Sequence, residues 1–200
     1  MGGLGSRVQV LACPYKPRFR GEVHVVVSTR KGIAAMSKKV AEIIVETLES
    51  AGVKHCYGVV GDTLNLIAYN ISKSGIEWVG MRHEEAGAFA AQGEALITGN
   101  LTAVAGSCGP GSLHFINGIV EANRNRAPVI LIASQIVRDE LGFEFPQEVD
   151  FKAIYGSCSV YCDMILTPAQ ARRKTVMACQ TAIARRGVRS EERRVGKECQ

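Results

Sequence analysis

The chain has 200 residues, a length that suits one domain with two flanking ends. Its formal net charge is +5, but residues 36–188 hold 14 basic residues against 15 acidic ones, so the excess positive charge belongs to the ends. This distribution excludes a broad basic face on the folded body and predicts no nucleic-acid partner.

Residues 1–35 differ from the rest of the chain. They hold six basic residues against one acid and show no sustained periodicity apart from the β-prone run 23–27. Two interpretations stay open: translated upstream sequence with Met36 as the true start, or a disordered extension. The apolar run 8–13 is too short for a signal peptide, and no run reaches the roughly 20 residues of a membrane span. We therefore expect a cytoplasmic protein.

From Met36 onward, helical and extended patterns alternate. The spacing of Val40, Ile44 and Leu48 predicts a first helix, with Ser37 as its N-cap and Gly52 as its stop. The expected strands lie at 55–60, 76–81, 101–106, 128–133 and 160–165, and the expected helices at 63–74, 85–98, 112–123, 150–155 and 168–186, with a loop at 135–149.

The start of the last helix is well marked, because Thr167 can cap it and Pro168 suits its first position. The strand at 128–133 is continuously apolar, as expected when helices cover both faces of a sheet. The alternation predicts a three-layer α/β/α sandwich with a parallel sheet.

Residues 189–200 interrupt this rhythm, which calls for another strand after Val188. They resemble the conceptual translation of a sequencing-adapter oligonucleotide. In that case the natural sequence is cut at about Val188, and the sheet is incomplete at its C-terminal end. A charged, solvated C-terminal helix is the alternative.

Cysteines and histidines give no metal-site pattern. The seven cysteines are odd in number, and Cys158 and Cys162 could form only half of a zinc site, so free and mostly buried thiols are expected. No two of the four histidines are spaced i,i+4. We therefore expect no metal ligands from this chain.

Residues 82–85 read Arg-His-Glu-Glu and follow the expected strand 76–81. Glu84 and Glu85 thus stand at the carboxyl end of a strand, where open α/β sheets bind ligands. One of two adjacent acids should face the ligand crevice, and a carboxyl group held there suits a proton-relay enzyme. The alternative is that both acids only favour a helix N-terminus.

A second turn, at 106–111, reads Gly-Ser-Cys-Gly-Pro-Gly. Glycines let the backbone approach a ligand closely, and Pro110 stiffens the turn. It is not a dinucleotide-binding fingerprint, because His114 stands where the third glycine would be. His114 and Asn117 are one turn apart on the expected helix and can share a face. The alternative is a tight turn followed by surface residues.

Together, these motifs resemble the N-terminal pyrimidine-binding domain of thiamine-diphosphate enzymes, nearest to pyruvate oxidases and quinone-linked pyruvate dehydrogenases. The resemblance covers about residues 38–188. The matching segments are 48–53, 57–62, 82–85, 88–91, 106–111, 113–114, 116–118, 128–129 and 147–148.

The resemblance implies a role for each motif. Glu84 would be the catalytic, cofactor-activating glutamate, hydrogen-bonded to a ring nitrogen of the cofactor's aminopyrimidine. The cofactor-binding positions would be Gly109, Pro110, Gly111 and Asn117. The substrate-pocket positions would be Gly61, His114 and Gln147. The substrate would be a small 2-keto acid that loses carbon dioxide.

The chain departs from the family at Pro146, which stands where an aromatic residue normally precedes Gln147 and Glu148. Pyruvate as the substrate is therefore open. The family's Gly-Asp-Gly…Asn pattern, which holds the diphosphate and Mg²⁺, and its flavin (FAD) domain are both missing here. The resemblance then implies a fragment that is inactive alone. Its parent would be a homo-oligomer, and peripheral membrane contact is expected only of that parent.

Three functions stay open at this point. The first is a fragment of a flavin-linked pyruvate-oxidising enzyme, and the second is an acetolactate-synthase-type carboligase of the same family. The third is a non-catalytic α/β interaction module in which Glu84 is only a helix-end acid.

Overall fold

The protein is described by a computed structural model that covers the backbone of residues 38–195 and the side chains of residues 38–188. The predicted leader at 1–35, with Met36 and the predicted cap Ser37, lies outside the described residues, as does the end of the predicted tail at 196–200. None of the described helices is long and apolar enough to cross a membrane.

Within residues 38–195, six parallel strands form one sheet in the order β2-β1-β3-β4-β6-β5. The strands are β1 (His55–Gly58), β2 (Glu77–Gly80), β3 (Thr102–Gly106), β4 (Val129–Val137), β5 (Tyr161–Ile165) and β6 (Arg189–Val195). Every residue of β3 is buried, and so is β4 up to its last residue. This is the burial expected of central strands covered on both faces.

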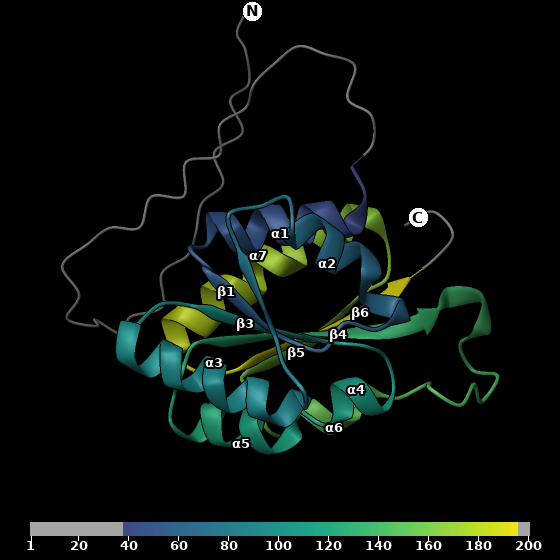
Figure 1. The fold of residues 1–200 in the computed structure, drawn as a ribbon. Coiled ribbons are helices and arrows are strands. Elements are labelled where there is room, and N and C mark those ends of the chain that lie inside the picture. The colour runs from purple at the N-terminus through teal and green to yellow at the C-terminus, as the bar shows by residue number, and fades with distance from the viewer. Residues whose placement is uncertain (1–37, 196–200) are drawn as a thin grey trace, which may run out of the picture. The chain divides into compact units, whose positions relative to one another are not determined.

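Helices cover both faces of the sheet (Figure 1), with α1, α2 and α7 on one face and α3, α4, α5 and α6 on the other. The helices are α1 (Val40–Ser50), α2 (Asn65–Ile71), α3 (Glu84–Thr98), α4 (Pro110–Leu113), α5 (Ile116–Arg124), α6 (Phe151–Tyr155) and α7 (Pro168–Arg185), with short 3₁₀ turns η1 (Asp62–Leu64) and η2 (Arg138–Glu140).

Two apolar cores lie between these layers. Side chains of β4 alternate between them, because successive residues of a strand point to opposite faces. Ile130 and Ile132 belong to the core under α1, α2 and α7, whereas Val129 and Leu131 belong to the core under α3 and α5. The predicted three-layer α/β/α sandwich with a parallel sheet is therefore confirmed.

The structure corrects the prediction that the sheet is incomplete at its C-terminal end. The backbone of β6 lies between β4 and β5 and pairs with both in parallel. The reason is that ladder hydrogen bonds join main-chain groups, so the segment that follows α7 fills the gap whatever its side chains are. The predicted adapter origin of residues 189–200 stays a prediction.

Three local expectations also change. β4 continues to Val137 instead of ending at 133, with an irregular register after Ser134. Lys39, not Ser37, is the N-cap of α1. Pro168 is at the first turn of α7 as predicted, but the Thr167 side chain makes no capping hydrogen bond. Gly52 has the positive φ of 90° expected just beyond α1.

Candidate functional site: a buried glutamate beside a glycine turn

The candidate site lies at the carboxyl ends of two strands that flank β1. β2 leads into α3, which begins at Glu84, and β3 leads into the turn at 107–109 and then α4. Because all strands are parallel, these two junctions lie at the same edge of the sheet. The two motifs that the sequence singled out are therefore neighbours in space.

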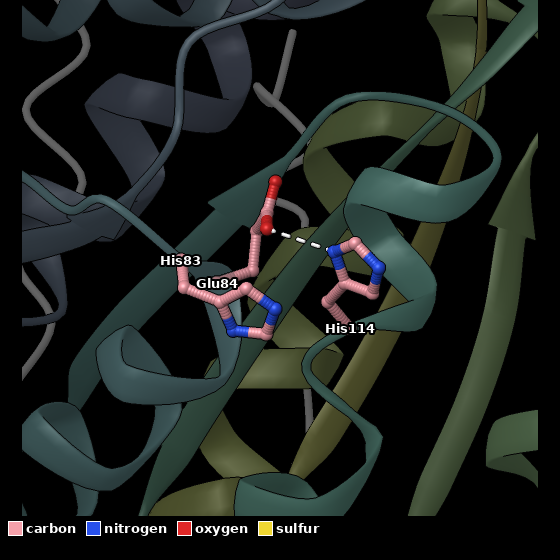
Figure 2. Close-up of side chains that lie close together, drawn as sticks. All are labelled: His83, Glu84 and His114. Atoms are coloured by element: carbon pink, nitrogen blue, oxygen red, sulfur yellow. Dashed lines mark hydrogen bonds and ion pairs between the residues drawn. The ribbon is translucent and has the colours of Figure 1, made fainter.

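Glu84 is the first residue of α3 and is only 8% exposed. Its Oε2 atom lies 3.1 Å from Nδ1 of His114 (Figure 2). Within the described part of the chain, its Oε1 atom has no hydrogen-bond partner. A Cβ atom on Gly111 would lie 3.3 Å from this oxygen. The glycine therefore leaves room beside a nearly buried acceptor atom that a ligand can use.

The neighbouring acid, Glu85, has a different environment. Its Oε1 atom accepts a hydrogen bond of 2.9 Å from the side-chain amide of Asn117. The two acids thus diverge, as expected for adjacent residues at the start of a helix. Asn117, a predicted cofactor-binding residue, is bonded to Glu85 and not to Glu84.

The helix predicted at 112–123 is divided into two. α4 ends at Leu113, and α5 begins at Ile116. Between them the chain bends to bury the Phe115 ring, which lies so close to Gly106 that a Cβ there would be 2.6 Å from it. His114 and Asn117 therefore do not share a helix face, and each contacts a different glutamate.

The glycine turn is fixed from two sides by residues predicted to line the substrate pocket. A Cβ atom on Gly61 would lie 2.6 Å from Oγ of Ser107. On the other side, a Cβ on Gly109 would lie 3.1 Å from Cα of Gln147, and Gly109 has a φ of 65° that favours glycine. Gly61 and Gln147 therefore touch the turn that borders Glu84.

Hydrogen bonds hold Cys108 inside this turn. Its backbone N–H donates to Oγ1 of Thr63 at 3.0 Å, and its Sγ lies 3.5 Å from Oε1 of Gln147. Burial is the main cause that raises the pKa of the Cys108 thiol. A neutral thiol at this place is a packing and hydrogen-bonding group, not a nucleophile. Pro110, the first residue of α4, is exposed beside it.

His83, Glu84 and His114 bring three metal-ligand atoms within 4.8 Å of one another. Sequence spacing gave no sign of this group, because 30 residues separate Glu84 from His114. The two imidazole rings stack at 4.7 Å with an interplanar angle of only 22°. Lone pairs in nearly parallel planes do not converge on one ion, whereas zinc needs ligands about 2.0–2.1 Å away. The arrangement thus favours a hydrogen-bonded acid–imidazole pair, and the expected absence of metal ligands stays a prediction.

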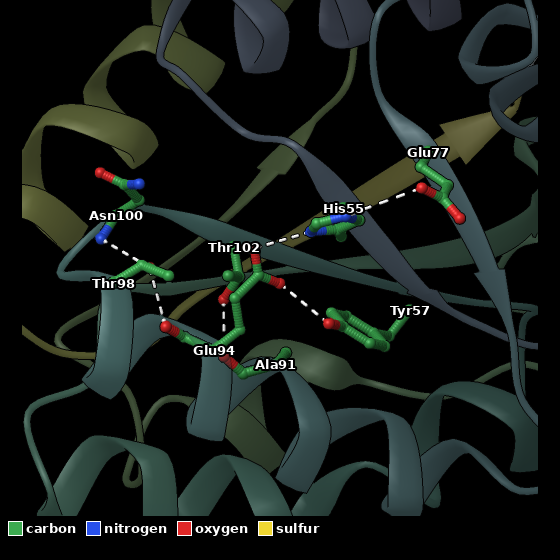
Figure 3. Close-up of polar contacts among 8 residues, drawn as sticks. All are labelled: His55, Tyr57, Glu77, Ala91, Glu94, Thr98, Asn100 and Thr102. Atoms are coloured by element: carbon green, nitrogen blue, oxygen red, sulfur yellow. Dashed lines mark hydrogen bonds and ion pairs between the residues drawn. The ribbon is translucent and has the colours of Figure 1, made fainter.

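A second polar cluster lies at the opposite, amino ends of the strands (Figure 3). Glu94, on the far half of α3, accepts a hydrogen bond of 2.9 Å from the hydroxyl of Tyr57 and lies 2.8 Å from Nδ1 of His55. Burial, followed by Glu94, raises the pKa of Tyr57 to about 12. The cluster joins α3 to β1, and so it helps to fix the helix that carries Glu84. The only sign of this cluster in the sequence is that His55 and Tyr57 are two residues apart on a strand, so that their side chains point to the same face.

Comparison with known proteins decides the family. Residues 38–154 match the family described as "thiamine pyrophosphate enzyme, N-terminal TPP binding domain". The chain belongs to this family. The predicted resemblance is therefore confirmed, and the domain is of the thiamine-diphosphate-binding type.

Curated relatives agree with this assignment. The chain is 46% identical over 151 residues to an uncharacterized 42.6 kDa protein in the isoamylase 3′ region of Pseudomonas amyloderamosa, covering 75% of this chain and 38% of that protein. It is 31% identical over 147 residues to a pyruvate oxidase of Lactiplantibacillus plantarum, covering 72% and 24%. An acetolactate synthase of Bacillus subtilis is 27% identical over 134 residues, covering 67% and 24%. The chain thus spans well under half the length of these relatives.

Proposed function

We propose that this chain is the N-terminal part of a thiamine-diphosphate-dependent enzyme that decarboxylates a 2-keto acid, of the pyruvate oxidase or quinone-linked pyruvate dehydrogenase type. The observation that carries the proposal is the state of Glu84. Its carboxylate is nearly buried, one oxygen is held by His114, and the other faces space kept open by Gly111. A relative named as a pyruvate oxidase supports the reaction type.

The residues at the site fit the aminopyrimidine of the cofactor. When bound, thiamine diphosphate supplies an acidic thiazolium carbon and an electron sink for decarboxylation. Oε1 of Glu84 would share a proton with a ring nitrogen, while His114 fixes the other oxygen and the orientation of the carboxylate. Gly109, Pro110 and Gly111 would lie beside the ring, because two of these positions lack a Cβ.

The remaining predicted site residues have roles around this centre. Gly61 and Gln147 contact the glycine turn, so we assign them to the wall of the substrate pocket beside His114. Asn117 would act at the pyrimidine through Glu85, to which it is bonded. Small residues at the turn and larger polar ones around it would give a substrate pocket both space and orientation.

Parts outside this chain complete the proposed enzyme. The chain spans 24% of the pyruvate oxidase relative, and we assign the binding of Mg²⁺ and FAD to the remainder of the parent protein. The parent would be a homo-oligomer with its active site between subunits, and this chain alone would be inactive. We assign it to the cytoplasm, since all five cysteines of the described part are free thiols.

The direct test is Glu84→Gln in the protein extended through its natural downstream reading frame. Glutamine keeps the shape but cannot share the proton, so exchange of the thiazolium carbon proton with deuterium should slow by about 10²- to 10⁴-fold, as expected for loss of a general acid–base group. NMR of quenched samples measures this exchange. Glu85→Gln is the matched control, because the glutamine side-chain oxygen can still accept the hydrogen bond from Asn117, and it should exchange within a few-fold of the unaltered protein. If the thiazolium carbon proton exchanges at the same rate in both variants, Glu84 does not have the proposed role.

An acetolactate-synthase-type carboligase is the second candidate. It is favoured by the acetolactate synthase among the relatives and by Pro146, which departs from the pattern of the oxidases. Incubating the extended protein with pyruvate separates the two. Acetolactate without a requirement for an electron acceptor would support the carboligase, whereas acceptor-dependent oxidation would support the first proposal.

A further inference from the structure

A second concave site lies far from Glu84 along the strands. A cavity of 580 Å³ opens between the end of α5, the end of α7 and the segment that precedes β5. Arg126 at its wall precedes β4, and Val160 precedes β5. The cavity therefore lies at the amino ends of the strands, whereas the candidate active site lies at their carboxyl ends.

Four arginines line this cavity: Arg124, Arg126, Arg185 and Arg186. None of the residues that the structure places at its wall is acidic. In the described part of the chain, Arg124, Arg126 and Arg185 have no ion-pair partner. The folded body as a whole carries a net charge of −1, with 14 basic and 15 acidic residues in 36–188. Positive charge is thus concentrated at one hollow, where a low-dielectric wall strengthens its field.

All four arginines stand at the ends of two helices. Arg124 and Arg185 are the last residues of α5 and α7, where a basic side chain stabilises the helix dipole. Arg126 and Arg186 lie beyond those ends with positive φ angles of 57° and 47°. That backbone region suits glycine and disfavours a long side chain. Both arginines take the left-handed conformation with which helices commonly end, and the N–H groups of Ala127 and Gly187 close the two turns on carbonyl oxygens of α5 and α7. Glycine is the usual residue in this conformation, so backbone preference does not account for arginine at the two positions.

The chemistry of the wall selects the ligand. Arginine presents a planar fork of N–H donors that matches the oxygens of phosphate groups. The volume of 580 Å³ is within the range of about 300–1,000 Å³ that is usual for small-molecule sites. Val120 and Val160 add an apolar part to the wall. We propose that this cavity binds a small diphosphate ligand, either inorganic pyrophosphate or a nucleoside diphosphate whose base contacts the apolar part.

The test uses the 200-residue chain and titrates it by calorimetry with pyrophosphate, ADP and AMP. Removing one arginine that makes charge-assisted hydrogen bonds should weaken diphosphate binding about tenfold. Arg185→Ala and Arg126→Gly are the two variants. The second also relieves the positive φ, so its thermal midpoint should not fall while its affinity does. Arg173→Ala, on an exposed part of α7 outside the cavity, is the matched control and should bind within twofold of the unaltered chain.

Comparison of the probes identifies the source of the diphosphate. Binding of ADP at least tenfold tighter than pyrophosphate assigns a nucleotide, and equal affinity with mutual competition assigns the diphosphate group itself. The proposal is overturned if neither probe binds saturably, if AMP binds as tightly as ADP, or if Arg173→Ala weakens binding as much as Arg185→Ala. Pocket-dependent binding of a single-stranded oligonucleotide without binding of pyrophosphate would also overturn it.

Discussion

Gly118 lies where α5 packs against α3, and its replacement by alanine probes the helix pair that carries the candidate site. A Cβ atom at this position would lie 2.4 Å from Cβ of Ala88 and 3.1 Å from the backbone nitrogen of Phe89. Carbon atoms in contact are normally about 3.5–4.0 Å apart. Neither neighbour can rotate away, because one is a methyl group fixed to the helix and the other is backbone. The helices would therefore have to separate by about 1.1–1.6 Å, which also moves the N-terminus of α3.

The expected loss of stability follows from two opposing contributions. Overpacking a close-packed core costs about 1–3 kcal/mol, and this contact is at the upper end because the clash is rigid. Alanine in place of glycine inside a helix stabilises the folded state by up to about 1 kcal/mol. The net effect of Gly118→Ala on the free energy of unfolding is then a loss of about 2 kcal/mol. For a domain of this size such a loss lowers the thermal midpoint by about 4–8 °C.

Gly93→Ala is the matched control, because it is the same substitution but should raise the free energy of unfolding instead of lowering it. Gly93 is inside α3, and nothing lies within 4 Å of a Cβ built there. This variant should gain about 0.5–1 kcal/mol, because only the helix propensity changes. Urea denaturation followed by circular dichroism gives both values. If the two variants unfold at the same urea concentration, the close approach of α3 and α5 is wrong and so is the placement of Glu84 against His114.

Two further changes test one half-buried tyrosine, Tyr57, and one buried tyrosine, Tyr155. The pKa of Tyr57 is raised to about 12 in the folded protein and is about 10 when unfolded, so its contribution to stability is complete below pH 10 and is lost as the pH rises to about 12. Tyr57→Phe should flatten this decline when the free energy of unfolding is measured by urea titration at each pH. An unchanged slope of stability against pH would contradict the assignment. The buried hydroxyl of Tyr155 donates to the carbonyl oxygen of Ser112 at the glycine turn, so Tyr155→Phe should lower the free energy of unfolding by about 1–2 kcal/mol. A denaturation midpoint that does not change would show that water replaces this donor.

Local sequence patterns were sufficient for most of the fold. Continuous apolar runs, such as the one that becomes β4, and helical spacing, as in α1, record which faces of an element are buried. The element predictions were wrong where tertiary packing outweighs local preference. The helix predicted at 112–123 divides because Phe115 must reach the core, and β4 runs past its predicted end to Val137.

The candidate site shows the same division between local and distant information. Short motifs identified Glu84 and the glycine turn, because a strand end followed by an acid or by glycines is a feature of consecutive residues. The contact of Glu84 with His114 spans 30 residues and was outside the reach of periodicity. The pair of His55 with Glu94 spans 39 residues and was missed for the same reason.

The sequence by itself determined the alternating strands and helices, the parallel sandwich and the family motifs, since each depends on residues close together in the chain. Only the tertiary structure decided which oxygen of Glu84 is held and which is open, that Asn117 bonds to Glu85, and that four arginines from two helix ends line one cavity. These are contacts between distant segments. They are set by how crossover helices pack on the sheet, and no local pattern of residues encodes that packing.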